Sequence, residues 1–341
     1  MQLRRGVPLA ALTTLRLGGP AGRLVEASTA AELVEAVRAA GDDLLLLGGG
    51  SNLVLADAGW PGTVVLIRSR GVTGTGDTGV AEAGEPWDEL VARTVAEGRS
   101  GLECLAGIPG LTGATPVQNV GAYGQEVADT IVRVDAYDRS AGVVRALRPQ
   151  ECGFGYRDSL FKHTDRWVVL RVAFALGRSG KSGPVRYAEL ARALGVELGQ
   201  MAPLEDVRSA VLGLRRGKGM VLDPADRDTW SVGSFFTNPV LPPAELAAFE
   251  ARAGGPYPSW PVDGTALTKL SAAWLIERAG FGKGYGGAAV RVSGKHTLAL
   301  THRGGGSTAE LVALAREIRD GVADRFAVTL RPEPRLVGVA L

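Results

Sequence analysis

The sequence has few of the residues on which disulfide and metal chemistry depend. Its 341 residues include only two cysteines, Cys104 and Cys152, and three histidines that stand far apart. Two cysteines without a CxxC spacing cannot form a disulfide framework or a thiolate metal site. The histidines also lack the HExxH spacing of zinc enzymes. We therefore expect two reduced cysteines and no metal site.

Long apolar runs and a strong charge bias are absent too. No apolar stretch approaches the roughly 20 residues of a membrane-spanning helix. The N-terminus is basic, but polar residues interrupt its apolar run too early for a signal peptide. The formal net charge is +2, which sets up no field that would attract nucleic acid or an anionic membrane. These features predict a cytoplasmic protein without nucleic acid or membrane as a partner.

Length and patterning predict an α+β protein. A chain of 341 residues with 45% hydrophobic content can form two or three domains, each with a buried core. Apolar runs and turn residues predict strands at 44–47, 63–68, 81–84, 131–138, 143–147, 167–176 and 327–331. Helical periodicity and capping boxes predict helices beginning after Thr29 and after Ser307, and at 86–97, 204–215 and 268–279.

A glycine-rich stretch without charge is the most informative part of the chain. Residues 106–124 contain five glycines and two prolines, with no Asp, Glu, Lys or Arg. Glycine allows backbone N–H groups to approach a bulky anion closely, so the stretch is typical of a buried ligand cradle. A tight turn between two core strands is the alternative.

A second glycine turn follows the apolar strand 44–47. Gly48-Gly49-Gly50-Ser51-Asn52 has neither the spacing of a dinucleotide-binding fingerprint nor the Lys-Ser/Thr pair of a P-loop. It continues into another apolar run, so we interpret it as a strand–turn–strand nest whose N–H groups and Ser51 hydroxyl can hold a pyrophosphate. Asn52 is one of only three asparagines, with Asn119 and Asn238, and all three lie in such loops.

Three further positions favour substrate chemistry. Arg157 lies among aromatic and apolar residues, where it either pairs with Asp158 or clamps a substrate carboxylate. Ser234 lies between a glycine and two phenylalanines with no histidine near in sequence, which suits a hydrogen-bond or proton donor better than a nucleophile. A hydroxyl that only bonds to backbone is the alternative. Glu333 lies between two prolines that stiffen the backbone, in either a surface turn or a positioned carboxylate.

Seven motifs together resemble the UDP-N-acetylenolpyruvoylglucosamine reductases, flavoenzymes that complete UDP-N-acetylmuramate for peptidoglycan synthesis. The resemblance holds in order and approximate spacing from about Thr14 to Gly338. The motifs are Gly48-Gly49-Gly50-Ser51-Asn52, Ile108-Pro109-Gly110 through Gly121-Ala122-Tyr123-Gly124, Gly155-Tyr156-Arg157-Asp158-Ser159, Gly233-Ser234-Phe235-Phe236-x-Asn238-Pro239, Ala272-Ala273-Trp274-Leu275-Ile276, Gly286-Gly287-Ala288-Ala289-Val290 and Pro332-Glu333-x-Arg335.

The resemblance implies an architecture and a cofactor. Two subdomains of the vanillyl-alcohol-oxidase/PCMH type would bind FAD, at 1–66 with 329–341 returning to it, and at 67–214. A third α+β domain, 215–328, would bind the substrate. Neither glycine loop contains a histidine, so FAD is expected to be non-covalent. The implied FAD-binding residues are Gly48, Gly49, Gly50, Ser51, Asn52, Pro109, Gly110, Gly113, Ala114, Thr115, Gln118, Asn119, Gly121 and Ala122.

The resemblance also implies the reaction. Hydride would pass from NADPH through FAD to the β-carbon of the enolpyruvyl group of the UDP-sugar. Arg157 and Glu333 match the pair that polarises the carboxylate, with Glu333 protonated or sharing a proton. Ser234 matches the proton donor to the α-carbon. The enzyme is expected to be monomeric.

Four residues match positions that contact the UDP-sugar or the NADPH that alternates with it: Tyr187, Lys218, Asn238 and Lys269. The Tyr187 segment indicates the subclass with a tyrosine-bearing lid. Two features depart from the family pattern: Pro334 replaces an apolar β-branched residue, and the segment between Lys218 and Ser234 is longer than expected. An FAD-dependent oxidase of a sugar or hydroxy acid, and a non-catalytic flavin-binding module, are the alternative functions.

Overall fold

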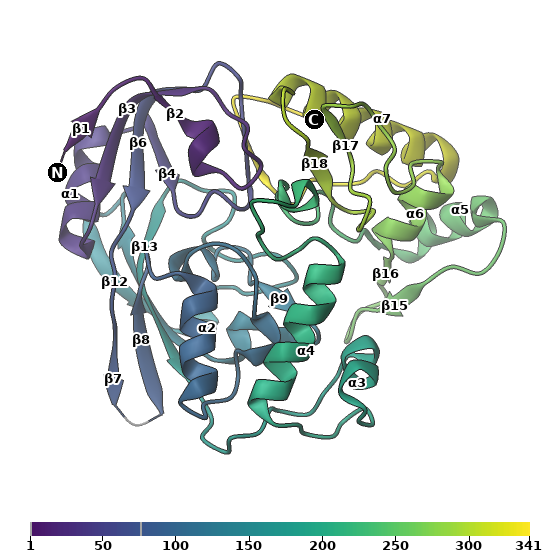
Figure 1. Cartoon of the computed structure of the whole chain (residues 1–341), viewed down its shortest axis with the longest axis horizontal. Coiled ribbons are helices and arrows are strands. Elements are labelled where there is room, and N and C mark those ends of the chain that lie inside the picture. The colour runs from purple at the N-terminus through teal and green to yellow at the C-terminus, as the bar shows by residue number, and fades with distance from the viewer. Residues whose placement is uncertain (1, 76) are drawn as a thin grey trace. The chain divides into compact units, whose positions relative to one another are not determined.

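A computed structural model describes residues 2–75 and 77–341 of the chain (Figure 1). The chain forms two compact units, each assembled from several segments. Unit 1 comprises residues 1–7, 21–49 and 61–217, and unit 2 comprises residues 8–20, 50–60 and 218–341. The glycine turn at 48–52 lies where the chain passes from unit 1 to unit 2. The predicted division into two FAD-binding subdomains and a substrate-binding domain describes which ligand each part binds, and it stays a prediction.

Unit 1 is built on two sheets. The first has the strand order β1-β3-β6-β4, with β2 pairing beside β3, and β4 runs parallel to β6. The second is antiparallel in the order β12-β11-β13-β8-β7. The strands are β1 (Leu3–Arg4), β2 (Val7–Pro8), β3 (Pro20–Ala27), β4 (Leu44–Leu47), β6 (Trp60–Ile67), β7 (Val72–Thr75), β8 (Thr78–Glu82), β11 (Ile131–Asp138), β12 (Val143–Leu147) and β13 (Trp167–Ala175). A separate hairpin is formed by β9 (Gly121–Ala122) and β10 (Gln125–Glu126).

Helices cover these sheets because one face of each is apolar. Helix α1 (Ala30–Ala40) begins at the predicted Thr29 cap and buries Leu33 and Val37 in a core that includes Tyr137 and Val168 of the second sheet. Helix α2 (Trp87–Ala96) buries Trp87, whose ring contacts Phe174 of β13 in a tilted arrangement, with 6.0 Å between the ring centroids. The remaining helices are α3 (Ala188–Leu194) and α4 (Leu204–Gly217), and α4 packs beside α2. Short 3-10 helices lie at 103–105, 112–114, 127–129 and 149–151.

Unit 2 has small sheets and three α-helices around one apolar core. Its sheets are β14-β16-β15, β17-β18 and the parallel pair β19-β5. The strands are β5 (Leu53–Leu55), β14 (Val240–Leu241), β15 (Ser259–Pro261), β16 (Thr268–Leu270), β17 (Val290–Val292), β18 (Leu300–His302) and β19 (Arg335–Val337). The helices are α5 (Pro243–Ala253), α6 (Ala272–Arg278) and α7 (Thr308–Phe326), with 3-10 turns at 9–12 and 227–229.

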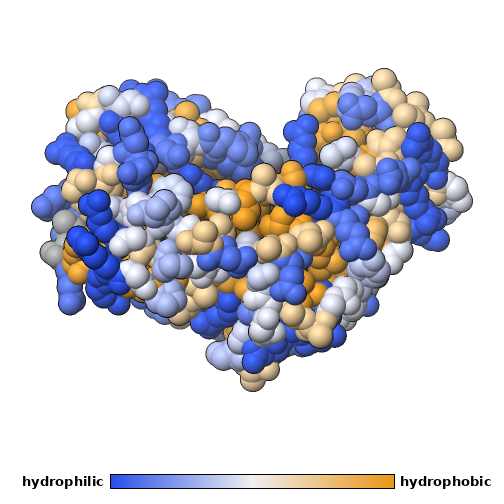
Figure 2. Space-filling model, turned by 90° about the horizontal axis from the view of Figure 1, so that it is seen from above, coloured by the Kyte–Doolittle hydropathy of each residue, from blue (hydrophilic) through white to orange (hydrophobic). Residues whose placement is uncertain are grey.

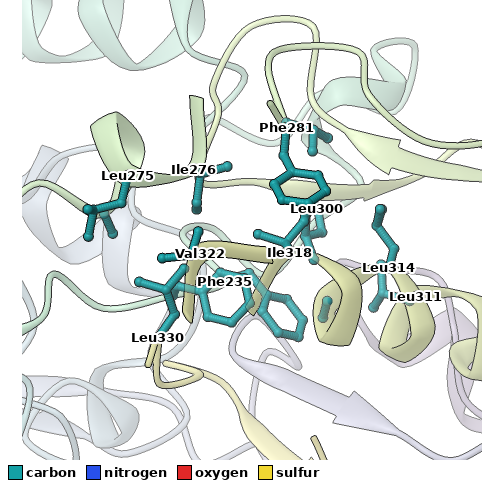
Figure 3. Packing of buried hydrophobic residues seen from close by; sticks show 14 of the residues in the cluster. Phe235, Leu275, Ile276, Phe281, Leu300, Leu311, Leu314, Ile318, Val322 and Leu330 are labelled. Carbon is teal, nitrogen blue, oxygen red and sulfur yellow. The ribbon is translucent and has the colours of Figure 1, made fainter. Parts of the chain in front are cut away.

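The core of unit 2 joins segments that are distant in sequence. Leu15 and Leu17 from the N-terminal segment pack with Val54, with Phe235 and with the apolar face of α7. Figure 3 shows Phe235 among Ile318, Val322 and Leu330. Burial of a large apolar side chain contributes about 1.5–3 kcal/mol. The serine loop around Phe235 is therefore anchored by this core.

Two predicted elements differ from the structure. Residues 268–279 do not form one helix: they form β16 and then α6, because Ser271 caps the helix after the strand. Residues 327–331 carry no strand, and the C-terminal strand is β19, four residues further on. Both predictions were based on an apolar run, whereas strand pairing and a capping serine set the boundaries of the elements.

On the face that Figure 2 shows, hydrophilic residues (blue) lie interspersed with apolar ones.

An ion pair between a buried aspartate and a partly exposed arginine makes the stability of unit 1 depend on pH. Asp138 ends β11 and accepts hydrogen bonds from Arg166 at 2.8 and 2.6 Å. These bonds, with the amides of Ala141 and Ser140, hold the pKa of Asp138 at about 2 despite its burial. The pKa of an unfolded aspartate is about 3.9. The folded carboxyl therefore contributes stability that is present above pH ~4 and is lost as the pH falls through about 2.

We predict that Asp138→Asn flattens this part of the stability profile. Wild-type protein should lose unfolding free energy more steeply than the variant between about pH 4 and pH 2. Urea titrations at closely spaced pH values measure this, with Asp42→Asn, an exposed aspartate of the same unit, as the control. Parallel profiles for wild type and Asp138→Asn would contradict the assignment.

Candidate active site

Two glycine loops touch each other in unit 1. A Cβ atom at Gly49 would lie 2.8 Å from the Cα atom of Gly110, and one at Gly48 would lie 3.4 Å from the side chain of Leu111. Contact below 3.0 Å between a side chain and backbone cannot be relieved by a rotamer change. Glycine at position 49 is therefore required by the close approach of two backbones. The two predicted cradle loops form one surface.

This surface presents backbone donors. Among the residues that the structure describes, the N–H groups of Gly48, Gly49 and Gly110 donate to no protein acceptor. Each of these glycines is half-buried. Successive N–H groups without internal partners form an anion-binding concavity. The arrangement suits a phosphate or pyrophosphate, as predicted for residues 48–49 and 110.

Residues further along the second loop are used mainly for its own structure. Gly113 is buried where a Cβ would lie 2.5 Å from that of Ala83, and its N–H donates to the Ala83 carbonyl. Thr115 is 3% exposed and donates its hydroxyl to Thr112 O at 2.8 Å. Ala114 is exposed. Direct binding of FAD by Pro109, Gln118 and the rest of this loop stays a prediction.

Asn119 links the cradle to the arginine loop. Its Nδ2 donates to Glu126 Oε2 at 2.7 Å and to Gly155 O at 3.1 Å, while its Oδ1 accepts from Ala128 N at 3.1 Å. The residue is 2% exposed and has a φ of 43°. Both amide hydrogens are thus engaged within the protein. The side chain of this asparagine therefore holds the cradle against neighbouring loops, and its predicted contact with the cofactor stays a prediction.

Arg157 lies against the end of the cradle. Its Nη2 donates to Gly121 O at 2.7 Å and its Nη1 to Asn119 O at 3.5 Å. A Cβ at Gly121 would lie 3.0 Å from Nη1, so glycine there makes room for the guanidinium. Asp158 Oδ1 accepts from Ser159 N at 2.9 Å. The clamping of a substrate carboxylate by Arg157 stays a prediction.

The backbone holds Arg157 in a strained conformation. Its φ is 53°, in the left-handed region that non-glycine residues rarely adopt. The Nζ of Lys162 donates to its carbonyl at 2.6 Å. Backbone strain of this kind costs on the order of 1–3 kcal/mol and persists only where neighbouring groups enforce it. The loop therefore fixes the position of the Arg157 guanidinium, and the strained backbone lowers the local stability.

An aromatic pair follows the cradle in unit 1. Tyr123 and Gly124 have φ values of 52° and 82° and form the turn of the β9–β10 hairpin. Tyr187, 44% exposed, meets Tyr123 edge-on at 5.4 Å. Burial raises the pKa of Tyr123 to about 12, so its phenol stays protonated and can donate a hydrogen bond.

In unit 2, close backbone contacts hold the last residues of the glycine turn, 50–52. Gly50 has a φ of 60°, and a Cβ there would lie 2.2 Å from the carbonyl of Leu12. The Asn52 carbonyl accepts from Arg335 N at 3.0 Å, and its Nδ2 lies 3.5 Å from Glu333 O. The turn and the C-terminal segment are thus joined through Asn52.

The predicted catalytic residues Ser234 and Glu333 are brought together within unit 2. The backbone N–H of Glu333 donates to Phe235 O at 2.9 Å, and Thr237 N donates to Arg331 O at 3.1 Å. The serine loop and the C-terminal segment therefore run antiparallel through a bridge between Phe236 and Pro332. Ser234 and Glu333 are both half-buried. Pro334, the departure noted above, is buried.

Two predicted substrate-binding residues lie near one another in unit 2. Lys269 lies on β16, opposite Val240 of β14 and Trp260 of β15. Asn238 precedes β14, and its Oδ1 accepts from Ala272 N at the start of α6 at 2.9 Å. This bond fixes the orientation of the Asn238 amide. Lys218 is half-buried beside Gly219, whose φ is 66°.

The long segment before Ser234 is held by ionic contacts. Asp226 accepts from Lys295 Nζ at 2.6 Å, and Asp228 accepts from Ser293 Oγ at 2.8 Å and lies 3.2 Å from Arg303 Nη1. Burial alone would raise the pKa of Asp228, but the hydrogen bonds from Ser293 and Gly294 and the charge of Arg303 lower it overall. This segment is therefore ordered, and it approaches Ser234 from a fixed direction.

Within the described residues, no group of three or more metal-ligating side chains occurs, and no helix is long and apolar enough to cross a membrane. Cys104 and Cys152 are buried free thiols, as predicted. Burial raises the pKa of Cys104 to about 12 and that of Cys152 to about 11, so both are inert as nucleophiles.

Comparison with known proteins identifies the family. A family model described as FAD binding domain matches residues 21–147, and one described as UDP-N-acetylenolpyruvoylglucosamine reductase, C-terminal domain, matches residues 223–337. The curated UDP-N-acetylenolpyruvoylglucosamine reductase of Salinispora arenicola is 62% identical over 98% of this chain and 95% of its own length.

The chain belongs to the UDP-N-acetylenolpyruvoylglucosamine reductase family.

Other family members and a solved structure agree. The reductase of Saccharopolyspora erythraea is 59% identical over 98% of this chain and 96% of its own length. A crystal structure of the reductase from Thermus caldophilus covers 99% of each chain with 25% identity and a TM-score of 0.68. The predicted fold class, an α+β FAD-binding fold of the PCMH type with a third, C-terminal domain, is confirmed.

The residues present fit the cofactor of this family. Gly48, Gly49 and Gly110 lie within the residues that the FAD-binding model matches, and their N–H groups are available to an anion. A side chain at position 49 would fill the space between the two loops. These backbone groups would hold the pyrophosphate of FAD.

We predict that Gly49→Ala impairs FAD binding. The added Cβ must displace the backbone at Gly110, which separates the two loops and misaligns their N–H groups. We expect the Kd for FAD to rise at least tenfold, measured by flavin fluorescence during titration of the apoprotein. Gly79→Ala, which adds a methyl group to the same unit where nothing lies within 4 Å, is the control. Equal FAD affinity in both variants would contradict this role for Gly49.

Proposed function

We propose that this chain is an NADPH-dependent UDP-N-acetylenolpyruvoylglucosamine reductase that uses non-covalent FAD. The observation that carries the proposal is 62% identity to a curated reductase over 98% of the chain. The substrate is the enolpyruvyl ether of UDP-N-acetylglucosamine and the product is UDP-N-acetylmuramate. The reaction supplies a precursor of peptidoglycan, and so contributes to cell-wall formation, cell shape and cell division.

The reaction adds a hydride and a proton across the enolpyruvyl double bond. FAD, held by the backbone N–H groups of Gly48, Gly49 and Gly110, would supply the hydride chemistry between NADPH and the β-carbon of the substrate. The electron pair of the double bond then resides on the α-carbon, delocalised into the carboxylate. The protein has to stabilise this charge and to supply a proton to the α-carbon.

Arg157 and Glu333 stabilise the developing charge at the substrate carboxylate. The strained loop of Arg157 and its bond to Gly121 fix the guanidinium before substrate arrives, so little reorganisation is needed during reaction. Glu333 must carry or share a proton, because an ionised carboxylate would repel the anion. Its position is set by the bond between its amide and Phe235.

Ser234 donates the proton to the α-carbon. A neutral serine is a weak acid, so it acts while surrounding groups stabilise the charge it would retain, or relays a proton from water. The pairing of the serine loop with the segment of Glu333 supports this role, since it keeps the two residues in one rigid element.

Tyr187, Lys218, Asn238 and Lys269 contact the UDP-sugar and, alternately, NADPH. The edge-on contact of Tyr187 with Tyr123 supports the subclass with a tyrosine-bearing lid, because it places that segment beside the cradle loop within unit 1. A monomeric state, a cytoplasmic location and the three-domain division belong to the same proposal.

A turnover assay tests the function. We expect the purified yellow protein to oxidise NADPH rapidly only when the UDP-enolpyruvyl sugar is added, with one NADPH consumed per sugar. Absorbance at the NADPH band follows the reaction. Consumption at the same rate without the sugar, with oxygen as acceptor, would indicate the oxidase. Bound FAD without turnover would indicate the non-catalytic flavin-binding module.

We predict that Ser234→Ala separates the two half-reactions. Reduction of the flavin by NADPH should proceed within about twofold of the wild-type rate, whereas reoxidation by the sugar should slow by at least 100-fold, as expected when a positioned acid is removed. Stopped-flow absorbance of the flavin measures each step. Ser234→Cys, which keeps a proton donor, should recover part of the second step. Equal losses in both steps would count against a proton-donor role.

A further inference from the structure

A buried threonine near the N-terminus lies between the glycine turn and the serine loop of unit 2. The hydroxyl of Thr14 donates to Ser231 O at 2.7 Å, and its backbone N–H donates to Gly50 O at 3.1 Å. The hydroxyl also lies 3.4 Å from Gly50 O, but its single hydrogen serves the shorter contact. Thr14 is 9% exposed. One residue therefore bonds to both loops.

The segment that carries Thr14 is rigid. Thr13 donates its hydroxyl to Leu17 O at 3.0 Å, and Arg16 N donates to Thr13 O at 3.3 Å, which closes a tight turn around Thr14. Leu15 and Leu17 pack into the same core as Phe235. The turn is thus fixed to the scaffold on both sides of Thr14, so its hydroxyl has a defined position.

Two hydrogen bonds connect this hydroxyl to Gly233, the residue before Ser234. Ser231, whose carbonyl accepts from Thr14, accepts the N–H of Gly233 on its own Oγ at 3.2 Å. Gly233 has a φ of 77° and forms a bend just before Ser234. On the other side of Ser234, Phe235 N donates to Leu298 O at 2.7 Å. The backbone on the N-terminal side of Ser234 therefore depends on Ser231, and through it on Thr14.

We propose that Thr14 is a positioning residue that sets the distance between the glycine turn at 50–52 and the serine loop at 231–234. This inference rests on the proposed function, in which the glycine turn holds the cofactor and Ser234 delivers a proton. The hydroxyl of Thr14 holds the serine loop, while its backbone N–H holds the glycine turn. Removing the hydroxyl loosens the serine loop at its N-terminal end, at Ser231, while the bonds of Phe235 and the glycine turn stay in place.

The test compares three variants of the holoenzyme. Thr14→Val removes the hydroxyl but keeps the shape, Thr14→Ser keeps the hydroxyl, and Thr13→Val removes a neighbouring buried hydroxyl that does not reach Ser231. We expect Thr14→Val to slow reoxidation of the flavin by the UDP-enolpyruvyl sugar about tenfold, the effect of losing one well-placed hydrogen bond. Reduction by NADPH should stay within twofold. Thr14→Ser should restore the reoxidation rate.

A second measurement does not require activity. Hydrogen–deuterium exchange of peptides that span residues 229–236 should be faster in Thr14→Val than in wild type, while Thr14→Ser and Thr13→Val should exchange as wild type does. Thr13→Val controls for general loosening of the turn, and we expect it to lower the melting temperature without changing the ratio of the two half-reactions.

The outcomes separate this inference from the proposed function. If the wild-type protein does not reduce the sugar, the proposed function fails, and the exchange measurement alone decides the coupling. Unchanged exchange at 229–236 in Thr14→Val would overturn the inference. So would equal slowing of both half-reactions, or the same effect from Thr13→Val. Faster exchange confined to Thr14→Val supports it.

Discussion

The close approach of backbones without intervening side chains is the constraint on which the site depends. Gly49 touches Gly110 in unit 1, and Gly50 touches Leu12 in unit 2, at distances that exclude any Cβ atom. Two consecutive glycines thus each make a close backbone contact, one in each unit. The N–H groups of Gly49 and Gly110 donate to no protein acceptor among the described residues, because the two loops meet through packing rather than through hydrogen bonds.

Internal contacts also hold the residues around Arg157. Asn119 has no amide hydrogen left for a ligand, yet it joins the cradle to the loop of Arg157 through Gly155. The guanidinium in turn bonds to Gly121 of the cradle. The glycine cradle and the loop of Arg157 are therefore one cross-linked assembly in unit 1. Preorganisation of this kind lets charge develop in the reaction without rearrangement of the protein.

Much of this could be predicted from sequence, and the failures have physical causes. Glycine content identified the cradle, apolar runs identified the strands 44–47 and 131–138, and the motifs pointed to Arg157, whose guanidinium donates to Gly121 O. The role of Asn119 could not be predicted from the sequence. The rarity of asparagine indicates that its amide makes specific contacts, but not whether the partner is a ligand or the protein itself.

Contacts between residues far apart in the chain could not be predicted from the sequence. Thr14 appears in sequence only as a polar residue that interrupts an apolar run, and its partner Ser231 lies 217 residues away. The strand assigned to 327–331 failed for the same reason, since β19 exists through pairing with β5, 282 residues before it at Leu53–Arg335. Local propensity does not contain such pairings.

The two prolines that flank Glu333 have a consequence for the fidelity of folding. Pro332 and Pro334 have no N–H groups, so Glu333 contributes the only backbone donor of this tripeptide, and Phe235 O accepts it. A slip of the segment by one residue in either direction would set that carbonyl against a proline nitrogen and leave it without a partner. The two prolines therefore permit only the register in which Glu333 lies beside the loop of Ser234. Shifted registers are disfavoured as the chain folds.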